Sequence, residues 1–281
     1  MSRLHENDII GIAGQLPQYD AALKKSLGYT LEEIARKAVG CREHNPGFRT
    51  AVIPITGGMG LIGGFSRTVS HILNHCRARA FVTDEPDVAG LQEAYKKGAE
   101  IIFLADDFIC SAFSTHSCVF SDNGYATGVG FAAALEIMAG KAPPAEVLIL
   151  GAGPVGSAAA AYLSQAGFDV IIHDTDEEKT RCAANKIAGV KAAGNIGDLK
   201  NYPYIVDATT ASGFINPEDV TAATKIAAPG MPLGVTEEAL AIACVFHNPL
   251  ELGIMAMYFD CVHQLALLNI KSGTEGAGHE R

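Results

Sequence analysis

The stretch "VLILGAGPVG" (residues 147–156) constrains the fold of this chain most, because an apolar strand runs directly into a GxGxxG turn. Such an unbroken apolar run is typical of a strand buried on both faces of a parallel sheet. A helix, "PVGSAAAAYLSQAG", follows the turn, and the next strand, "FDVIIHD", ends at Asp174, eighteen residues after the last glycine. This is the complete βαβ context of a dinucleotide-binding unit, so the sequence predicts a Rossmann domain.

Each part of this motif has a role in binding a dinucleotide. The glycines allow close approach of the pyrophosphate, the helix N-terminus faces the phosphates, and the carboxylate of Asp174 binds ribose hydroxyls. Because Asp174 would repel a 2′-phosphate and no arginine follows it immediately, the sequence favours NAD over NADP. The predicted cofactor-binding residues are Gly151, Gly153, Pro154, Val155, Gly156, Asp174, Thr209, Thr210 and Pro229.

Positions in two segments of this unit have structural alternatives. Thr209 and Thr210 follow the third strand of this unit, where they either line the cofactor crevice or cap the next turn. Asp176 is either a second ribose contact or a helix N-cap, and the "EEK" after it favours the cap.

The length of 281 residues suits two domains, and the first half has its own strand and helix pattern. Periodic apolar positions predict helices over the first forty residues. Strands alternating with helices of about ten residues follow and predict a parallel sheet. The strands are expected at 51–56, 79–84 and 100–107, and the helices at 66–76 and 87–98.

Residues 108–128 are polar and irregular, which predicts a long functional loop before a helix at 129–140. Two prolines in "KAPPAE" mark the domain boundary. The predicted fold is therefore α/β: an N-terminal helical and α/β substrate domain (1–142), then a Rossmann domain with a C-terminal helix that packs back (143–270), and a disordered tail (271–281). Within the second domain, a helix is also predicted at 217–227.

Composition excludes several classes of function. The formal charge of −10 and pI near 5.3 argue against nucleic acid as a partner and are compatible with a cationic small substrate. The chain has neither a signal peptide nor an apolar run near the roughly 18 residues of a membrane span, so we expect a cytoplasmic protein without a membrane partner. Seven cysteines, never spaced as CxxC, are expected to be reduced thiols.

A metal site is not expected. His71 and His75 lie four residues apart beside Cys76, a spacing that could place two imidazoles on one helix face. No HExxH motif or other ligand cluster accompanies them, so a structural role is favoured.

The stretch "TGGMGLIGGF" (56–65) is a second glycine-rich turn, but it lacks the GK[ST] ending and the lysine of a phosphate loop. Its glycines instead allow close backbone approach to a non-phosphate ligand or to the facing domain.

Acidic side chains follow the strands of the first domain. Asp84, Asp87 and the pair Asp106 and Asp107 should converge on one sheet edge, because parallel strands end there together. Acids gathered without Lys or Arg favour a cationic ligand such as an amine, or a metal; helix N-caps are the alternative, above all for Asp87 and Asp107. Asp106 directly follows "IIFLA", so we expect a partly shielded carboxylate that binds or deprotonates an ammonium group.

An ordered set of motifs is specific to one family. "PITGGMGLIGGFS", "TDEPDVAG", "GAEIIFLADD", "DNGYATG", "VLILGAGPVG", "HDTDEE", "APGMP" and "NPLELG" occur in that order, and the chain from about residue 54 to residue 258 thereby resembles the NAD-dependent pyrrolysine synthases. The resemblance implies oxidation of the terminal amine of L-lysine-Nε-(3R)-methyl-D-ornithine, loss of ammonia and cyclisation to pyrrolysine by a homodimeric enzyme.

The resemblance also implies substrate-binding residues: Leu4, Gly57, Asp106 and Asn123, with Asp106 the catalytic candidate. Gly57 stands where the family has serine, so Thr56 or a water is expected to replace that hydroxyl contact. Two other functions stay open: another NAD-dependent amino-acid or imine dehydrogenase, and a non-catalytic NAD-sensing protein.

Overall fold

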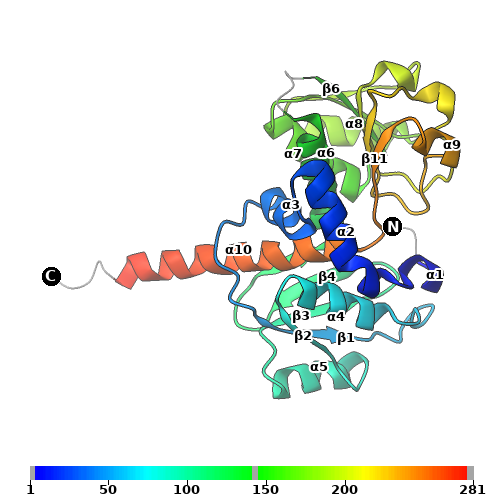
Figure 1. The fold of residues 1–281 in the computed structure, drawn as a ribbon. Coiled ribbons are helices and arrows are strands. Elements are labelled where there is room, and N and C mark those ends of the chain that lie inside the picture. Colours follow the sequence, from blue (N-terminus) through cyan, green and yellow to red (C-terminus); the bar gives the residue numbers. More distant parts are fainter. Residues whose placement is uncertain (1–3, 141–144, 277–281) are drawn as a thin grey trace.

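The computed structural model describes residues 4–140 and 145–276, which form two α/β units joined by long helices (Figure 1). The first unit has a five-stranded sheet in the order β2-β1-β3-β4-β5, and the second has a six-stranded sheet in the order β11-β10-β9-β6-β7-β8. The predicted α/β class, with helices at the N-terminus and a long C-terminal helix, is confirmed.

The N-terminal helices are α1 (Glu6–Ile9), α2 (Ile12–Leu27) and α3 (Leu31–Ala38). α3 begins at a capping box, in which the Thr30 hydroxyl accepts the Glu33 N–H and the Glu33 carboxylate accepts the Thr30 N–H. Its buried side chains, at i, i+3, i+4 and i+7 from Leu31, form the apolar stripe of an amphipathic helix. α3 packs this stripe against the two long helices in the middle of the molecule.

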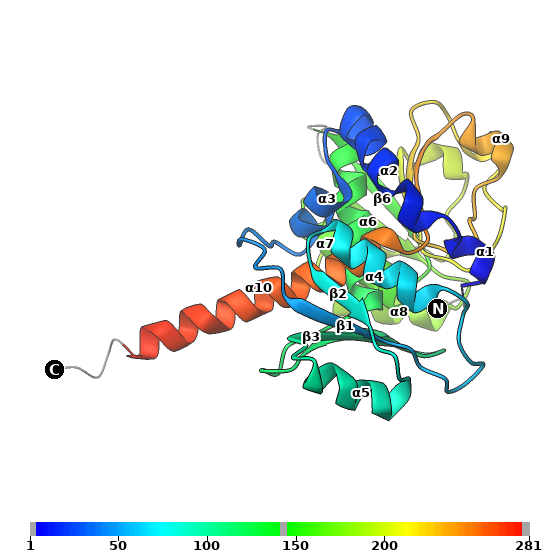
Figure 2. The same cartoon turned by 60° about the horizontal axis from the view of Figure 1, so that its bottom comes forward.

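The first sheet starts with three parallel strands, β1 (Arg49–Ile53), β2 (Arg79–Val82) and β3 (Ile101–Ala105), joined through α4 (Phe65–His75) and α5 (Asp87–Lys96). Alternate residues of β1 face opposite sides: Ala51 and Ile53 pack under α5, whereas Val52 joins the main core. Figure 2 shows α5 on its own side of this sheet. The predicted strand and helix order of this region is confirmed.

The prediction of an irregular loop at 108–128 is wrong. Two antiparallel strands, β4 (Cys110–Ser114) and β5 (Phe120–Asp122), extend the sheet, and α6 (Asn123–Ala139) begins directly afterwards. Ala112 and Ser121 are buried and paired across the two strands, so backbone pairing compensates for the low hydrophobicity of the segment. The side chain of Asp122 accepts the Tyr125 N–H and thereby starts α6 six residues earlier than predicted.

The second sheet is entirely parallel. Its strands are β6 (Glu146–Leu150), β7 (Asp169–His173), β8 (Val190–Ala192), β9 (Tyr204–Asp207), β10 (Lys225–Ala227) and β11 (Cys244–Phe246). Its helical elements are α7 (Pro154–Gln165), α8 (Glu177–Lys186), α9 (Glu237–Leu240), η1 (Leu199–Asn201) and η2 (Pro217–Asp219). β6 is buried at four of its five residues, as expected of a strand covered on both faces.

The prediction of a helix at 217–227 is wrong. Only the 3-10 turn η2 forms there, and residues 225–227 are the strand β10. The Thr224 hydroxyl accepts the Thr221 N–H at 2.9 Å, which closes a turn between the two elements. Threonine side chains stabilise such turns at the expense of helix, and the pattern of apolar residues does not show this.

Two long helices, α6 and α10 (Glu251–Gly276), connect the units. α10 packs against α3, α4, α6, β4 and β5, and its C-terminal part extends away from the body of the molecule (Figures 1 and 2). The helix continues six residues past the predicted end at residue 270; no proline interrupts this stretch. The predicted domain boundary at 142/143 and residues 277–281 lie outside the described residues.

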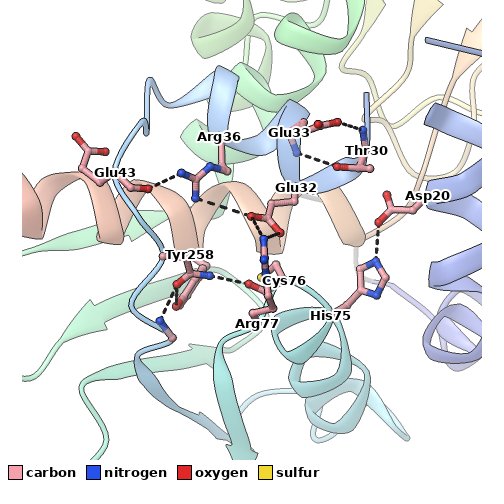
Figure 3. Close-up of polar contacts among 12 residues, drawn as sticks. Asp20, Thr30, Glu32, Glu33, Arg36, Glu43, His75, Cys76, Arg77 and Tyr258 are labelled. Carbon is pink, nitrogen blue, oxygen red and sulfur yellow. Dashed lines mark hydrogen bonds and ion pairs between the residues drawn. The ribbon is translucent and has the colours of Figure 1, made fainter. Parts of the chain in front are cut away.

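Polar side chains fasten the N-terminal segment to α4 and α10 (Figure 3). The His75 imidazole lies 2.6 Å from the Asp20 carboxylate, and the Arg77 guanidinium lies 3.0 Å from Glu32. The Tyr258 hydroxyl, in the first half of α10, donates to Asn45 at 2.8 Å. One continuous apolar core therefore forms from the beginning, middle and end of the chain.

We expect Gly128→Ala to destabilise the protein. A Cβ at Gly128 would lie 2.4 Å from the Val155 carbonyl oxygen and 2.7 Å from the Ala158 Cβ, so α6 and α7 would have to separate. Overpacking of this kind costs about 1–3 kcal/mol. Thermal and urea unfolding measure the effect.

Gly14→Ala is the matched control, because Gly14 lies in α2 and an added Cβ would meet no atom within 4 Å. It should leave stability unchanged or raise it by up to about 1 kcal/mol. Equal unfolding curves for the two variants would contradict close packing of α6 on α7.

Candidate active site

A cavity of about 170 Å³ lies between the two units. The ends of β1 and β3 and the loops after them form one wall, and the starts of α6, α7 and α10 approach from the other side. Of the substrate-binding residues expected from the sequence, Leu4, Gly57, Asp106 and Asn123 line this cavity, as do Val155 and Pro229 from the cofactor set. Among the described residues, the lining contains Asp side chains but no Lys, Arg, His or Glu.

The glycine-rich loop 56–64 is fixed by two carboxylates. Thr56 donates its backbone N–H to Asp87 at 2.9 Å and its hydroxyl to the other oxygen of the same carboxylate. Asp107 accepts the Met59 N–H at 2.6 Å, and a Cβ at Gly58 would lie 2.0 Å from the Asp107 carboxylate. Asp87 and Asp107 therefore hold this loop, in place of the N-cap roles considered for them, and the Thr56 hydroxyl is turned to Asp87 and not to the cavity.

Asp106 stands at the end of β3, at the mouth of the cavity. Its Oδ1 accepts the N–H groups of Ile109 at 2.7 Å and Phe108 at 2.8 Å, and these bonds hold the pKa of the carboxyl below its ordinary value. The expectation of a shielded carboxylate is wrong, because β3 ends at Ala105 and Asp106 is exposed. An accessible carboxylate with a lowered pKa is ionised at neutral pH, so it is suited to binding a cation and is a weak base.

Asn123 begins α6 and faces α10. Its Oδ1 accepts the Thr127 hydroxyl at 3.0 Å, and both side chains lie against Gly253 in the first turn of α10. A Cβ at Gly253 would lie 2.6 Å from the Thr127 hydroxyl oxygen. Glycine at this position therefore lets the two helix starts meet beside the cavity.

The predicted dinucleotide loop has the expected construction. Gly151 has a φ of 95°, which favours glycine, and a Cβ at Gly156 would lie 1.8 Å from the Gly151 carbonyl oxygen. A Cβ at Gly153 would meet no protein atom within 4 Å. The first and third glycines are thus required by the loop itself, whereas the second leaves open space over the N-terminus of α7, where Pro154 is the first residue.

Asp174 follows β7 and contacts the loop directly. Its carboxylate accepts the Ala152 N–H at 2.8 Å and the Asp176 N–H at 2.9 Å. Burial raises the pKa of Asp174, but the two hydrogen bonds and the nearby Lys179 and His173 side chains together hold this pKa below its ordinary value, so the carboxylate is ionised at neutral pH. Asp176 accepts the N–H groups of Glu178 and Lys179, which confirms its N-cap role.

The remaining predicted cofactor residues follow β9 and β10. The Thr209 hydroxyl donates to Asp207 at 2.7 Å and accepts the Ala211 N–H at 3.3 Å, an arrangement that favours the turn-capping alternative. Thr210 is exposed. Pro229 lies in the cavity wall beside the dinucleotide loop.

Several cavity residues were not expected from the sequence. Phe108 and Ile109 are exposed residues of the lining, and Asn248, Leu250 and Gly253 come from the segment before α10 and from its first turn. The motif "NPLELG" contains the last three and was noted only for its family resemblance. Its Asn-Pro pair before a long apolar helix was the available signal for a site at that helix N-terminus.

The two histidines considered as metal ligands lie in different surroundings. His75 pairs with Asp20 and His71 is exposed. In the described part of the chain, no three His, Cys, Asp or Glu side chains gather where a metal ion could be held. Over the same residues, no helix is both long and apolar enough to cross a bilayer.

Comparison with known proteins places the chain in a family. A model described as the N-terminal domain of pyrrolysine biosynthesis protein PylD matches residues 8–120, and one described as the C-terminal domain of alanine dehydrogenase/PNT matches residues 129–227. The chain is 30% identical over 240 residues to the pyrrolysine synthase of Methanosarcina barkeri, covering 85% of this chain and 89% of that protein. The chain belongs to the pyrrolysine synthase family.

A second pyrrolysine synthase, from Methanosarcina acetivorans, is 27% identical over 267 residues, covering 92% of this chain and 99% of that protein. Membership of the pyrrolysine synthase family, with a dehydrogenase-type second half, supports a dehydrogenase role in pyrrolysine biosynthesis.

Solved structures share the fold. The quinate dehydrogenase of Corynebacterium glutamicum in complex with NAD has a TM-score of 0.52 and 13% identity, covering 77% of this chain and 93% of that one. A shikimate dehydrogenase in complex with NADP+ has the same TM-score and identity, covering 76% of this chain and 96% of that one. At this identity the comparison shows a common two-unit architecture only.

Gly153→Ala and Gly156→Ala should separate cofactor binding from folding. Because no protein atom lies near a Cβ at Gly153, this variant should keep the melting temperature of the free protein and lose most of the stabilisation that added NADH gives. Gly156→Ala should lower the melting temperature without any ligand, since its Cβ would overlap the Gly151 carbonyl. Thermal scans with and without NADH test both variants. If NADH still raised the melting temperature of folded Gly153→Ala by the same amount, the dinucleotide would have to bind away from this loop.

Proposed function

We propose that this protein is an NAD-dependent dehydrogenase that oxidises the terminal amine of L-lysine-Nε-(3R)-methyl-D-ornithine and forms pyrrolysine. The observation that carries the proposal is the position of Asp106: an exposed, ionised carboxylate at a cavity that also reaches Val155 of the glycine-rich dinucleotide loop. A cationic amine held there would lie next to the binding site of a redox cofactor.

The cofactor proposal rests on the loop and on Asp174. The open space at Gly153 and the N-terminus of α7 fit a pyrophosphate, and the ionised Asp174 fits ribose hydroxyls and repels a 2′-phosphate. Since the structural neighbours include one complex with NAD and one with NADP+, the choice of NAD depends on Asp174. When bound, the dinucleotide supplies the acceptor for the hydride.

The proposed reaction balances without a further co-reactant. The amine carbon loses a hydride and the amine nitrogen a proton, which leaves an imine; water then adds and ammonia leaves, giving an aldehyde. The α-amine of the ornithine half attacks this aldehyde, water is lost, and the ring closes. The substrate loses one ammonia and two hydrogens in total.

The residues of the chain bind and orient in this scheme. Asp106 holds an ammonium group of the ornithine half, because its lowered pKa keeps it anionic and makes it a poor proton acceptor. Asn123, fixed by Thr127, orients the substrate at the start of α6. Buried apolar side chains, Ile53 and Phe131, form the inner wall of the cavity and exclude water from the reacting carbon.

The proposal extends to a homodimeric, cytoplasmic enzyme. Phe120 on β5 and Leu267 and Leu268 on α10 are 58%, 44% and 43% exposed, and these two elements contact each other. Exposed apolar side chains on adjacent elements fit the surface of a subunit interface.

The function is tested by incubating the protein with NAD and L-lysine-Nε-(3R)-methyl-D-ornithine. Mass spectrometry should show a product that lacks one ammonia and two hydrogens, with NADH formed in equal amount. NADP in place of NAD should give much slower turnover. An unchanged substrate mass would reject the proposal, and NADH formation with other amines only would favour a different amine dehydrogenase.

Asp106→Asn separates the charge of this residue from its structural role. The amide oxygen can still accept the N–H groups of Phe108 and Ile109, so the turn is kept and only the charge is removed. Hydrogen bonds to charged groups contribute about 1.5–3 kcal/mol, so kcat/KM should fall by about ten- to a hundredfold. NADH-induced stabilisation should stay unchanged.

Asp84→Asn is the control for this variant. Asp84 also follows a strand of the first sheet, but it is paired with Lys97 on the surface at 3.2 Å and does not line the cavity. The kcat/KM of Asp84→Asn should equal that of the unmodified protein. Equal losses in both variants, or a loss of NADH binding in Asp106→Asn, would contradict the role assigned to Asp106.

A further inference from the structure

Asn248 stands between β11 and α10, in the wall of the cavity. Only 4% of the residue is exposed, although its side chain is polar. The large majority of buried side-chain polar atoms have at least one hydrogen-bond partner. The contacts of the two ends of this amide therefore decide what the residue does.

The oxygen end of the Asn248 amide is occupied. Oδ1 accepts the N–H of Leu252, in the first turn of α10, at 3.1 Å. A backbone N–H can only donate, so this bond fixes which end of the amide is oxygen. The nitrogen, Nδ2, must then point the other way.

The nitrogen end has no hydrogen-bond partner among the described residues. Two other buried side-chain atoms there share this property, Ser121 Oγ and Asp207 Oδ2, and neither residue lines the cavity. Leaving a buried donor unpaired costs about 1–3 kcal/mol. Asn248 thus combines an unpaired buried donor with a position in the cavity wall.

The Tyr19 side chain lies close to the Asn248 amide and could compete for this nitrogen. Burial raises the pKa of Tyr19 to about 12, while the nearby Asn248 amide acts in the opposite direction. The Tyr19 hydroxyl donates to the His247 carbonyl at 3.3 Å. Since Nδ2 carries two hydrogens, even a contact with Tyr19 would leave one of them without an acceptor.

Two helix starts line the same cavity as Asn248 and are suited to an acceptor oxygen. The start of α10 (Leu250, Gly253) and the start of α4 (Phe65, Ser66) line the same cavity, and helix N-termini carry partial positive charge. The described lining residues include no Lys or Arg, so no basic side chain is available there to bind an anionic group instead of the helix starts.

We propose that Asn248 is a further ligand-binding residue, whose Nδ2 donates a hydrogen bond to a carboxylate or carboxamide oxygen of the bound ligand. That oxygen belongs either to the substrate or to the nicotinamide carboxamide of the cofactor. The inference rests on the proposed function, because it takes both molecules from there. It gives the cavity two opposite recognition elements: the Asp106 carboxylate for a cation, and the Asn248 amide with the helix starts for an acceptor oxygen.

The test uses Asn248→Asp and Asn248→Ala. The Asp variant can still accept the Leu252 N–H but has no donor, so it isolates the role of Nδ2. The Ala variant introduces no buried charge and remains informative if Asn248→Asp folds poorly. For each variant we would measure the melting temperature, the Kd for NADH by fluorescence titration, and kcat and KM for the substrate.

Asn74→Asp is the matched control. The Asn74 amide donates to the Ala80 carbonyl at 3.0 Å and accepts the Ala80 N–H at 2.9 Å, away from the cavity lining. This variant also loses a donor and keeps an acceptor, so it should lower the melting temperature and leave the Kd for NADH and the KM for the substrate unchanged.

We expect a ten- to a hundredfold loss of affinity for one ligand in both Asn248 variants. A raised substrate KM with an unchanged Kd for NADH assigns the acceptor oxygen to the substrate, and a raised Kd for NADH assigns it to the nicotinamide carboxamide. Unchanged values in a folded Asn248→Ala would overturn the inference. The unmodified protein is assayed beside them, so that failure of the proposed function appears separately, as an inactive unmodified enzyme.

Discussion

The close contact of α6 with α7 is the constraint on which the rest of the structure depends. Where α6 meets the dinucleotide loop it carries glycine: a Cβ at Gly124 would lie 2.9 Å from Pro154, and one at Gly128 would lie 2.4 Å from the Val155 carbonyl. No larger residue would let the two helices approach so closely. Because Asn123 begins the same helix, this contact also fixes the distance between Asn123 and the glycine-rich loop at residues 151–156.

The cavity combines two opposite electrostatic elements without a basic side chain among its described lining residues. On one wall, Asp106 is kept ionised by the backbone of its own turn. On the other, helix starts and the Asn248 amide present donors. Fixed backbone dipoles do not need to reorganise when a ligand binds, whereas lysine and arginine side chains lose conformational freedom. A zwitterionic amino acid fits such an arrangement better than a simple amine or a simple acid.

The glycine-rich loop at residues 151–156 and the first three strands of the first unit were predictable, because their signals are local: a glycine motif after an apolar strand, and helices of regular length between strands. β4 and β5 were not, since Ala112 and Ser121 become core residues only through pairing with each other and with β3. The role of Thr56 was missed because its partner, Asp87, is thirty-one residues away. Asn248 was missed because an unpaired donor can be recognised only when every neighbouring group is in place.

The position of α10 has a consequence for synthesis of the chain. The first helices complete their core against the last one: α3 packs on α10, and the Tyr258 hydroxyl bonds to Asn45. A nascent chain emerging from the ribosome therefore leaves part of the apolar face of α3 exposed until α10 has left the exit tunnel. The first unit cannot complete its core before α10 has been made, so the cavity walls contributed by the two units come together only after that point.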